Sequence, residues 1–375
     1  MKLHLNGRQA LFDTIGFWIP IGKLTSLDTK LFDNYDAFKN RKIYISKLKT
    51  NETQYHPQLS LRRFELNKKG HASKNYQEAL FVQVSAPKLT LGSSISDITC
   101  AEYNNFIRRT LYWLNKFGIQ TKKEAVSSAT VYEIHPVLNI WMPDFYDGFD
   151  SYDVFDELAK YWLPYLDSTS IVFSDQTGWE IQWHNGKNEV VIYDKRAEIK
   201  RNGFNCLPSS INLPVIKDGI TVMEKIKNVI RFEIRLRSGV NIRQKKQNLL
   251  CEGNDLPANF TVKDAFETDL CHRIKQVYAN KLFKYRPVFH VSDYIADNPD
   301  IMLSKYNPSN EKLKKAACDL QMKNLSRVSL SATQIKILTD IGKGLPPNHT
   351  DEWISYLQNQ IENDMAVQIR ERNLQ

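Results

Sequence analysis

Hydrophobic and polar residues alternate along much of the first part of the chain, and a period of two is typical of strands with one buried face. Before residue 90 the alternation occurs over 11–21, 42–48, 59–66 and 79–87. Polar residues that favour turns separate these stretches. The pattern therefore predicts a sheet-rich N-terminal region.

A long stretch at 98–118 has its apolar residues at helical spacing instead. Thr99 or Asp97 would cap the start of this helix, and Gly118 would end it. Further strand patterns follow at 128–142, 178–186 and 229–239, and in 188–200, where the alternation of β-branched residues ends on Tyr193. Helix patterns occur at 151–163 and 220–229.

After residue 261 the patterns are helical only, over 261–282, 331–342 and 350–373. Turn residues at 252–259 mark the change. We therefore predict an α+β fold, in which an antiparallel β-sheet with flanking helices occupies residues 1–255. A helical C-terminal domain would follow over residues 256–375.

The composition is that of an ordinary globular protein, because 42% of the 375 residues are hydrophobic and 25% are charged. A formal net charge of +9 favours a polyanionic partner such as nucleic acid. The five cysteines form no CxxC pair, so neither a zinc cage nor a disulfide framework is indicated. The apolar run at 15–22 is too short to span a membrane. We expect a soluble, unexported protein of a reducing cytoplasm, without a membrane partner.

The first candidate chemical group is a pair of polar residues on one predicted strand. Side chains two apart share a face of a strand, so Glu133 and His135 should lie together, as should Glu233 and its neighbours on the strand at 229–239. Carboxylates and an imidazole form a plausible partial shell for a divalent cation. The alternative is a solvated strand face with cross-strand ion pairs, and the spacing alone favours that alternative.

The second candidate group lies where the strand pattern that begins at residue 188 ends, in "YDKRAE". Tyr193 is a potential nucleophile, Lys195 a cation able to stabilise a phenolate or a phosphate, and Glu198 a nearby carboxylate. A tyrosine hydroxyl has a pKa near 10, so attack on a phosphodiester requires activation by a metal ion or a lysine. The alternative is a packing tyrosine with its hydroxyl at the rim, which the sequence alone favours.

The densest basic segment covers residues 231–247 and suits contacts with phosphates. A solvated, charged edge strand would give the same pattern. The candidate DNA-binding residues are Arg231, Arg235, Arg237, Arg243, Lys245 and Lys246.

Taken in order, several stretches resemble the replication initiators of filamentous phages, the gene II/X family, and more distantly the trans-acting rolling-circle initiators of plasmids. The resemblance covers most of the first 250 residues. It is carried by "FDTIGFWIPI", "VQVSAPKLTLGSS", "ATVYEIHPVLNI", "GWEIQWHNG" leading to "IYDKRAE", and "VIRFEIRLR".

The resemblance implies a rolling-circle initiator-like nuclease domain that nicks one strand of a phage or plasmid origin. The enzyme would stay covalently on the 5′ phosphate through Tyr193 and leave a 3′ hydroxyl as primer, while Lys195 would hold the phosphate. Glu133, His135 and Glu233 would bind Mg²⁺ or Mn²⁺, and Glu198 would be a ligand or support one. The family often has an arginine and an aspartate where this chain has Glu133 and His135.

The implied partners are origin DNA, both double-stranded and nicked, and the helicase and polymerase of a bacterial host cell, in whose cytoplasm the protein would act. Two alternatives remain open at this point. A relaxase that mobilises a plasmid or integrated element would use the same chemistry at a different origin. A non-catalytic origin-binding protein or repressor would use Tyr193 only for packing.

Overall fold

The structure is a computed structural model that describes residues 11–65, 76–92, 98–141, 155, 158, 168–174, 178–184, 188–195, 229–250, 259–283 and 355–361. The chain divides into two compact units, each built from stretches far apart in sequence. The first unit comprises Met1–Asn139, Asn202–Ile226 and Arg235–Ile274, and the second comprises Ile140–Arg201, Lys227–Ile234 and Lys275–Gln375.

An antiparallel sheet forms the centre of the first unit, in the strand order β3-β4-β5-β1-β7. The strands are β1 (Phe12–Pro20), β3 (Ile45–Lys47), β4 (Gln58–Glu65), β5 (Tyr76–Ser85) and β7 (Thr130–Trp141), whose last two residues belong to the second unit. The strands expected from the alternation before residue 90 and at 128–142 are therefore confirmed.

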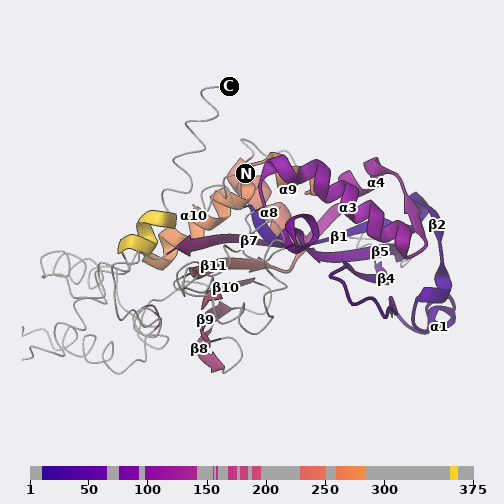
Figure 1. Cartoon of the computed structure of the whole chain (residues 1–375), viewed down its shortest axis with the longest axis horizontal. Coiled ribbons are helices and arrows are strands. Elements are labelled where there is room, and N and C mark those ends of the chain that lie inside the picture. Colours follow the sequence, from indigo (N-terminus) through magenta and orange to yellow (C-terminus); the bar gives the residue numbers. More distant parts are fainter. Residues whose placement is uncertain are drawn as a thin grey trace, which may run out of the picture. The chain divides into compact units, whose positions relative to one another are not determined.

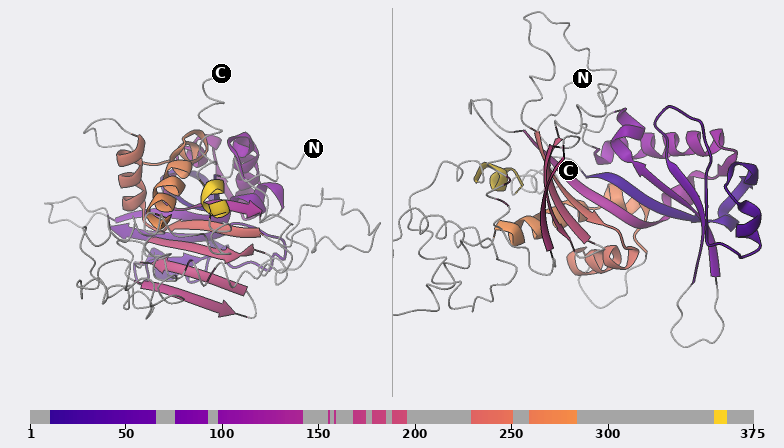
Figure 2. Two further views of the ribbon diagram at one scale, coloured as in Figure 1. Left: turned by 90° about the vertical axis from the view of Figure 1, so that its left-hand side faces the viewer. Right: turned by 90° about the horizontal axis from the view of Figure 1, so that it is seen from below.

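The helices of the first unit cover one face of this sheet (Figure 1, Figure 2). They include α2 (Ala86–Leu91), α3 (Tyr103–Lys116), α4 (Lys123–Ser127) and α9 (Val262–Glu267). Phe17 of β1 is fully buried beneath them, 6.5 Å from the Phe106 ring of α3. Phe266 of α9 packs between Phe12 and Phe106, at 5.1 and 5.2 Å.

The helix expected at 98–118 is confirmed, together with its caps. It begins as a single turn, η3 (Cys100–Glu102), and continues as α3. Thr99 and Glu102 form a reciprocal capping box, which satisfies backbone N–H groups at the helix start. Gly118 follows the helix with a φ of 66°, a left-handed conformation that glycine adopts without strain.

Short elements at the edge of the first unit were not expected from the sequence. They are η1 (Ile21–Lys23), β2 (Leu24–Leu27), η2 (Thr29–Leu31), α1 (Tyr35–Lys39) and β6 (Ile119–Thr121), and β2 pairs with β6 in a separate two-stranded sheet. Segments of three to five residues are too short to display a periodicity.

The strands of the second unit follow the order β11-β10-β9-β8. They are β8 (Ser168–Ser174), β9 (Gly178–His184), β10 (Asn188–Asp194) and β11 (Val229–Leu236), whose last two residues belong to the first unit. The pairs β8–β9 and β9–β10 are antiparallel. The pattern at 178–239 predicts three of these strands and misses β8.

A helix, α8 (Gly239–Leu250), follows β11 where the sequence indicated only a continuous basic segment. The buried side of α8 has few apolar residues, and Ile242 is a fully buried one among those whose side chains are described. With so few apolar positions between charged ones, the sequence shows no helical period. The helical pattern at 261–282 is confirmed, divided at Thr268 into α9 and α10 (Leu270–Phe283).

The described strands and helices confirm an α+β fold with an antiparallel sheet and flanking helices. The predicted helices at 220–229 and 331–342 lie outside the described residues, as do most of those at 151–163 and 350–373, although residues 355–361 are helical. The domain boundary at residue 255 stays a prediction. Within the described part, no helix has both the length and the apolar character required to cross a membrane.

Candidate active site

Tyr193 lies near the end of β10, in a strand whose residues from Val190 to Tyr193 are all buried. Burial on both faces holds this part of the backbone firmly, and β9 pairs with it so that Glu180 lies opposite Tyr193. The Tyr193 side chain is 8% exposed. The strand therefore presents the phenol in a defined position.

The Tyr193 hydroxyl donates a hydrogen bond to Oε2 of Glu233 at 3.2 Å. Glu233 belongs to β11 and is 5% exposed, so both partners are buried. A carboxylate within hydrogen-bond reach of a hydroxyl can accept its proton, which is the arrangement of an activated nucleophile. The sequence placed both residues among its candidates but did not pair them.

Lys195 is the first residue after β10 and is 1% exposed. Its Nζ atom lies 5.7 Å from the centre of the Tyr193 ring. A cation at this range stabilises negative charge that develops on the phenol oxygen. Tyr193, Lys195 and Glu233 thus bring together a potential nucleophile, a cation and a proton acceptor, all within the second unit.

Arg231 shares a face of β11 with Glu233 and is also buried, at 1% exposed. A charged strand in contact with solvent would leave both side chains exposed, so that interpretation does not describe these two residues. An arginine buried to this degree does not present its guanidinium at the surface, so its burial argues against a direct contact with a DNA phosphate. The expected contact is untested and stays a prediction.

In the first unit, Glu133 and His135 lie side by side on β7, with His135 Nε2 3.0 Å from Glu133 Oε1. They are 8% and 7% exposed, so the solvated strand face is wrong for this pair. Gln83 of β5 donates from Nε2 to Glu133 Oε2 at 3.1 Å, and Arg237 Nε lies 3.8 Å from Glu133 Oε1.

The donor types of this pair fit a divalent cation, because a carboxylate oxygen and an imidazole nitrogen both ligate such ions. The pair supplies two ligands, and an ion between them would replace their mutual contact. Within the residues that the structure describes, no group of three or more His, Cys, Asp or Glu is arranged to hold a metal. Glu198, the fourth expected ligand, lies outside the described residues.

The sequence interpretation missed a row of half-buried rings on the sheet face opposite α3. Trp18, Phe64, Phe81 and Tyr132 follow one another at centroid distances of 5.3, 5.8 and 5.0 Å, and the Arg62 guanidinium lies 4.6 Å from the Phe81 ring. Trp18, Phe64 and Phe81 are outward positions of the alternation, where half-burial is compatible with large side chains.

Tyr132 occupies this row because β7 carries a bulge. Gly16 pairs with Glu133 and Phe17 with Val131, which leaves Tyr132 as the extra residue. Burial raises the pKa of Tyr132 to about 12, against a smaller opposing effect of Arg62. Its hydroxyl is buried without a hydrogen-bond partner among the described residues. Tyr132 therefore stays protonated near neutral pH and is a poor nucleophile.

The other expected DNA-binding residues have different surroundings. Arg237 and Arg243 are exposed, whereas Arg235 and Lys245 are half-buried. Arg237 is the first residue after β11 and lies 3.8 Å from Glu133, while Arg243, Lys245 and Lys246 belong to α8. The Lys246 side chain lies outside the described part.

Comparison with known proteins gives little. The sequence matches no family model. It also matches no curated protein. Among solved structures it is similar to a rolling circle replication initiator protein from Geobacillus stearothermophilus, with 12% identity and a TM-score of 0.24 over 61% of this chain and 74% of that chain. A likeness of this size carries no argument about fold or function, so the function must be argued from the side chains themselves.

Proposed function

We propose that this protein is a DNA endonuclease and ligase that nicks an origin and starts rolling-circle replication, with Tyr193 as its nucleophile. The observation that carries the proposal is the 3.2 Å hydrogen bond from the Tyr193 hydroxyl to Glu233, beside the buried ammonium of Lys195. A net charge of +9 and the resemblance of "IYDKRAE" and "RFEIRLR" to phage initiators support it.

In the proposed reaction, Glu233 accepts the phenol proton while the Tyr193 oxygen attacks a backbone phosphorus. The bond from phosphorus to the 3′ oxygen breaks, and that oxygen takes a proton to leave a free 3′ hydroxyl. The 5′ phosphate stays on Tyr193 as a phosphotyrosine, and the reverse attack by a 3′ hydroxyl closes the strand. Lys195 counters the negative charge at the phenol oxygen.

The proposal includes Mg²⁺ or Mn²⁺, with Glu133 and His135 of the first unit as ligands, while Glu233 acts as the base. When bound, the ion would neutralise charge on the phosphate. Because nitrogen ligation suits Mn²⁺ better than Mg²⁺, His135→Ala should raise the Mn²⁺ concentration needed for half-maximal nicking. His135→Asp should retain nicking with Mg²⁺. An unchanged metal titration in His135→Ala would remove this residue from the ligand set.

The central test uses supercoiled plasmid that carries the chain's own locus, incubated with the protein and Mg²⁺. Tyr193→Phe removes only the attacking oxygen, so nicked circles and the covalent adduct should disappear while origin binding persists. Tyr132→Phe is the matched control, because Tyr132 is a half-buried tyrosine on another strand whose hydroxyl is buried. An adduct that persists in Tyr193→Phe would rule out the assignment.

One observation favours a second candidate, a non-catalytic origin-binding protein or repressor. Tyr193 is only 8% exposed and its hydroxyl is satisfied by Glu233, which is also how a packing tyrosine behaves. This candidate predicts origin binding without nicked circles or adduct in the unaltered protein. The plasmid assay therefore separates the two.

A further inference from the structure

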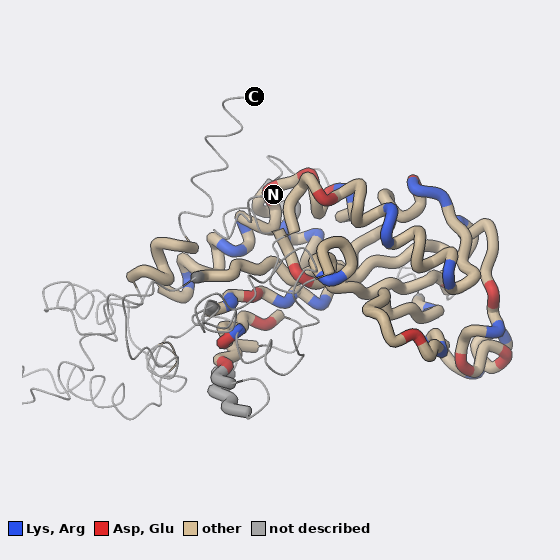
Figure 3. The backbone as a smooth tube through the Cα atoms, viewed as in Figure 1, with Lys and Arg blue, Asp and Glu red and all other residues tan. Residues whose placement is uncertain are grey.

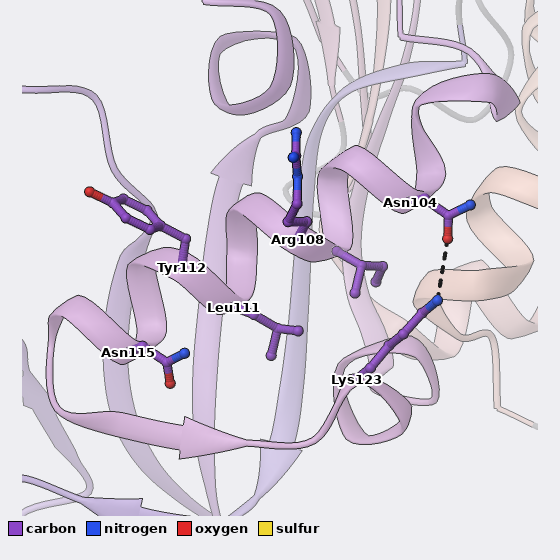
Figure 4. Close-up of a pocket in the computed structure, with 7 residues that line it drawn as sticks. Asn104, Arg108, Leu111, Tyr112, Asn115 and Lys123 are labelled. Atoms are coloured by element: carbon purple, nitrogen blue, oxygen red, sulfur yellow. Dashed lines mark hydrogen bonds between the residues drawn. The ribbon is translucent and has the colours of Figure 1, made fainter.

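A shallow pocket of about 400 Å³ lies on the outer side of α3, away from the groups described above. We call this surface the α3 face. Ile107 and Leu111 supply its apolar part, and Figure 4 shows Arg108 and Tyr112 extending from the helix while Lys123 reaches from α4 to Asn104. Its lining residues are Asn104, Ile107, Arg108, Leu111, Tyr112, Asn115 and Lys123. All of them belong to the first unit.

The two cations that line the α3 face, Arg108 and Lys123, hydrogen-bond to amides and not to carboxylates. Residues 103–124 contain five lysines and arginines against one carboxylate, Glu124, and one of the five, Lys116, pairs with Glu52. Figure 3 marks the cationic positions along the helix. The Arg108 side chain donates to the amide oxygen of Asn105 at 3.0 Å, and Lys123 donates to that of Asn104 at 3.3 Å. A neutral amide fixes a cation in place without cancelling its charge, so this charge remains available to a polyanion.

The second feature is an aromatic ring in solvent. Tyr112 is 54% exposed, one turn of helix after Arg108, with the apolar Leu111 beside it. Exposed rings next to cations are the platforms on which proteins stack unpaired bases. A duplex keeps its bases paired inside and offers mainly phosphates to such a surface. Of the two forms of DNA, the ring and the apolar part of the pocket therefore suit an unpaired strand.

We propose that the α3 face binds single-stranded DNA, with phosphates on Arg108 and Lys123 and a base stacked on Tyr112. The amide of Asn115 would meet the edge of a base, while Asn104 Oδ1 accepts from Lys123 and holds that cation in place. The inference goes beyond the proposed nicking reaction, because it requires no chemistry at Tyr193. It would let the protein retain the strand that nicking releases.

The test is fluorescence anisotropy of the full chain with a labelled 20-nucleotide oligo(dT) and with a labelled hairpin duplex, over a series of salt concentrations. Stacking contributes about 1–3 kcal/mol per base, so Tyr112→Ala should weaken oligo(dT) binding by about 5- to 150-fold. Tyr112→Phe keeps the ring and should bind nearly as the unaltered chain does. Each phosphate contact on a single strand contributes about 0.7 to the salt slope, which is the fall of log K with log salt concentration. The double variant Arg108→Gln/Lys123→Gln removes two such contacts, so the slope should become smaller by about 1.4.

Matched controls come from another surface of the same unit. Tyr44 is 56% exposed, and Lys39 and Lys42 are exposed, so Tyr44→Ala and Lys39→Gln/Lys42→Gln repeat the same chemical changes there. These controls should leave oligo(dT) affinity and salt slope unchanged, and Tyr112→Ala should leave duplex affinity unchanged because a duplex offers no unpaired base to the ring. Tyr193→Phe should bind oligo(dT) normally, which keeps this test independent of the nicking proposal. Equal effects of Tyr112→Ala and Tyr44→Ala on oligo(dT) affinity, or a loss of duplex affinity in Tyr112→Ala as large as its loss of oligo(dT) affinity, would overturn the inference.

Discussion

At the scale of residues, the site depends on how a few buried polar groups meet. Tyr193, Lys195 and Glu233 are all less than one-tenth exposed, and a buried charge is costly unless it has partners. In the second unit the phenol and the carboxylate satisfy one another. In the first unit, Gln83, His135 and Arg237 surround the carboxylate of Glu133. Each carboxylate is therefore held in one orientation before any substrate binds.

Glu233→Gln provides a direct measure of proton transfer. The amide has nearly the same shape as the carboxylate and can still accept a hydrogen bond from Tyr193, but it cannot take the proton. Loss of a general base typically slows a reaction by about 10²- to 10⁴-fold, so adduct formation should slow by that amount while origin affinity stays the same. The rate is measured as phosphotyrosine adduct formed with time on a denaturing gel. An unchanged rate would contradict the assigned role of Glu233.

Tyr132→Phe tests an isolated hydroxyl. The Tyr132 hydroxyl is buried without a partner among the described residues, so its removal should stabilise the protein by about 1 kcal/mol at pH 7. At alkaline pH the variant should also lose less stability than the unaltered chain, because it has no Tyr132 proton to release. The unfolded chain releases this proton near pH 10 and the folded chain near pH 12, so stability that is present below pH 10 is lost as the pH rises toward 12.

Urea unfolding at pH 7, 9, 10 and 11 measures both effects of Tyr132→Phe. The variant should show a weaker loss of stability above pH 10 than the unaltered chain. A variant that is less stable at pH 7 and loses stability just as steeply above pH 10 would show that the hydroxyl has a partner.

At the scale of elements, periodicity predicted the long strands and α3 but not how the strands meet. The alternation placed Glu133 beside His135, because residues two apart on one strand share a face whatever that strand pairs with. It could not find Gln83, whose approach to Glu133 depends on both strands pairing with β1 around Gly16. Nor could it place Tyr132, since a bulge depends on the register of two strands. The bond between Tyr193 and Glu233 joins residues 40 positions apart, and no local pattern encodes such a contact.

Gly16→Ala tests the bulge. A Cβ at Gly16 would lie 2.7 Å from Cζ of Tyr132 and 3.0 Å from Cβ of Glu133, so the ring or the strand would have to move. Overpacking of this kind costs about 1–3 kcal/mol, which urea unfolding should reveal. Gly22→Ala is the matched control, because a Cβ there meets nothing within 4 Å. Equal stability of the two variants would show that the bulge accommodates a methyl group freely.

At the scale of the whole molecule, segments distant in sequence complete the first unit. The Val131 N–H donates to the carbonyl of Phe260 at 2.8 Å, and the Val262 N–H donates to that of Ala129 at 3.0 Å. Phe266 then covers Phe12 and Phe106. Residues 260–266 are thus part of the same core as β1. The helical patterns after 261 gave no sign of this, because a helix that covers a distant sheet and a helix in its own domain have the same period.

A truncated chain of residues 1–255 tests this dependence. It loses both backbone hydrogen bonds to residues 260–262 and the ring of Phe266, so Phe12 and Phe106 become accessible to water. Removing one large aromatic side chain from a core costs about 3–5 kcal/mol, a large part of the stability of an ordinary domain. Circular dichroism should show a lower melting temperature than in a chain that ends at residue 283. Equal melting temperatures would mean that residues 256–283 do not support the first unit.

The hydrogen bonds between residues 129–131 and 260–262 also have a consequence for synthesis. A ribosome that adds about 5–20 residues per second needs about 6 to 24 s to go from the end of β7 at residue 141 to residue 261. During that time the new chain carries the ring of Phe12 and the backbone of Val131 without their final partners. Nascent protein is then open to chaperones and to pairing with strands of neighbouring chains. Yield in a cell should therefore depend on translation speed between residues 141 and 261, although no part of the site changes.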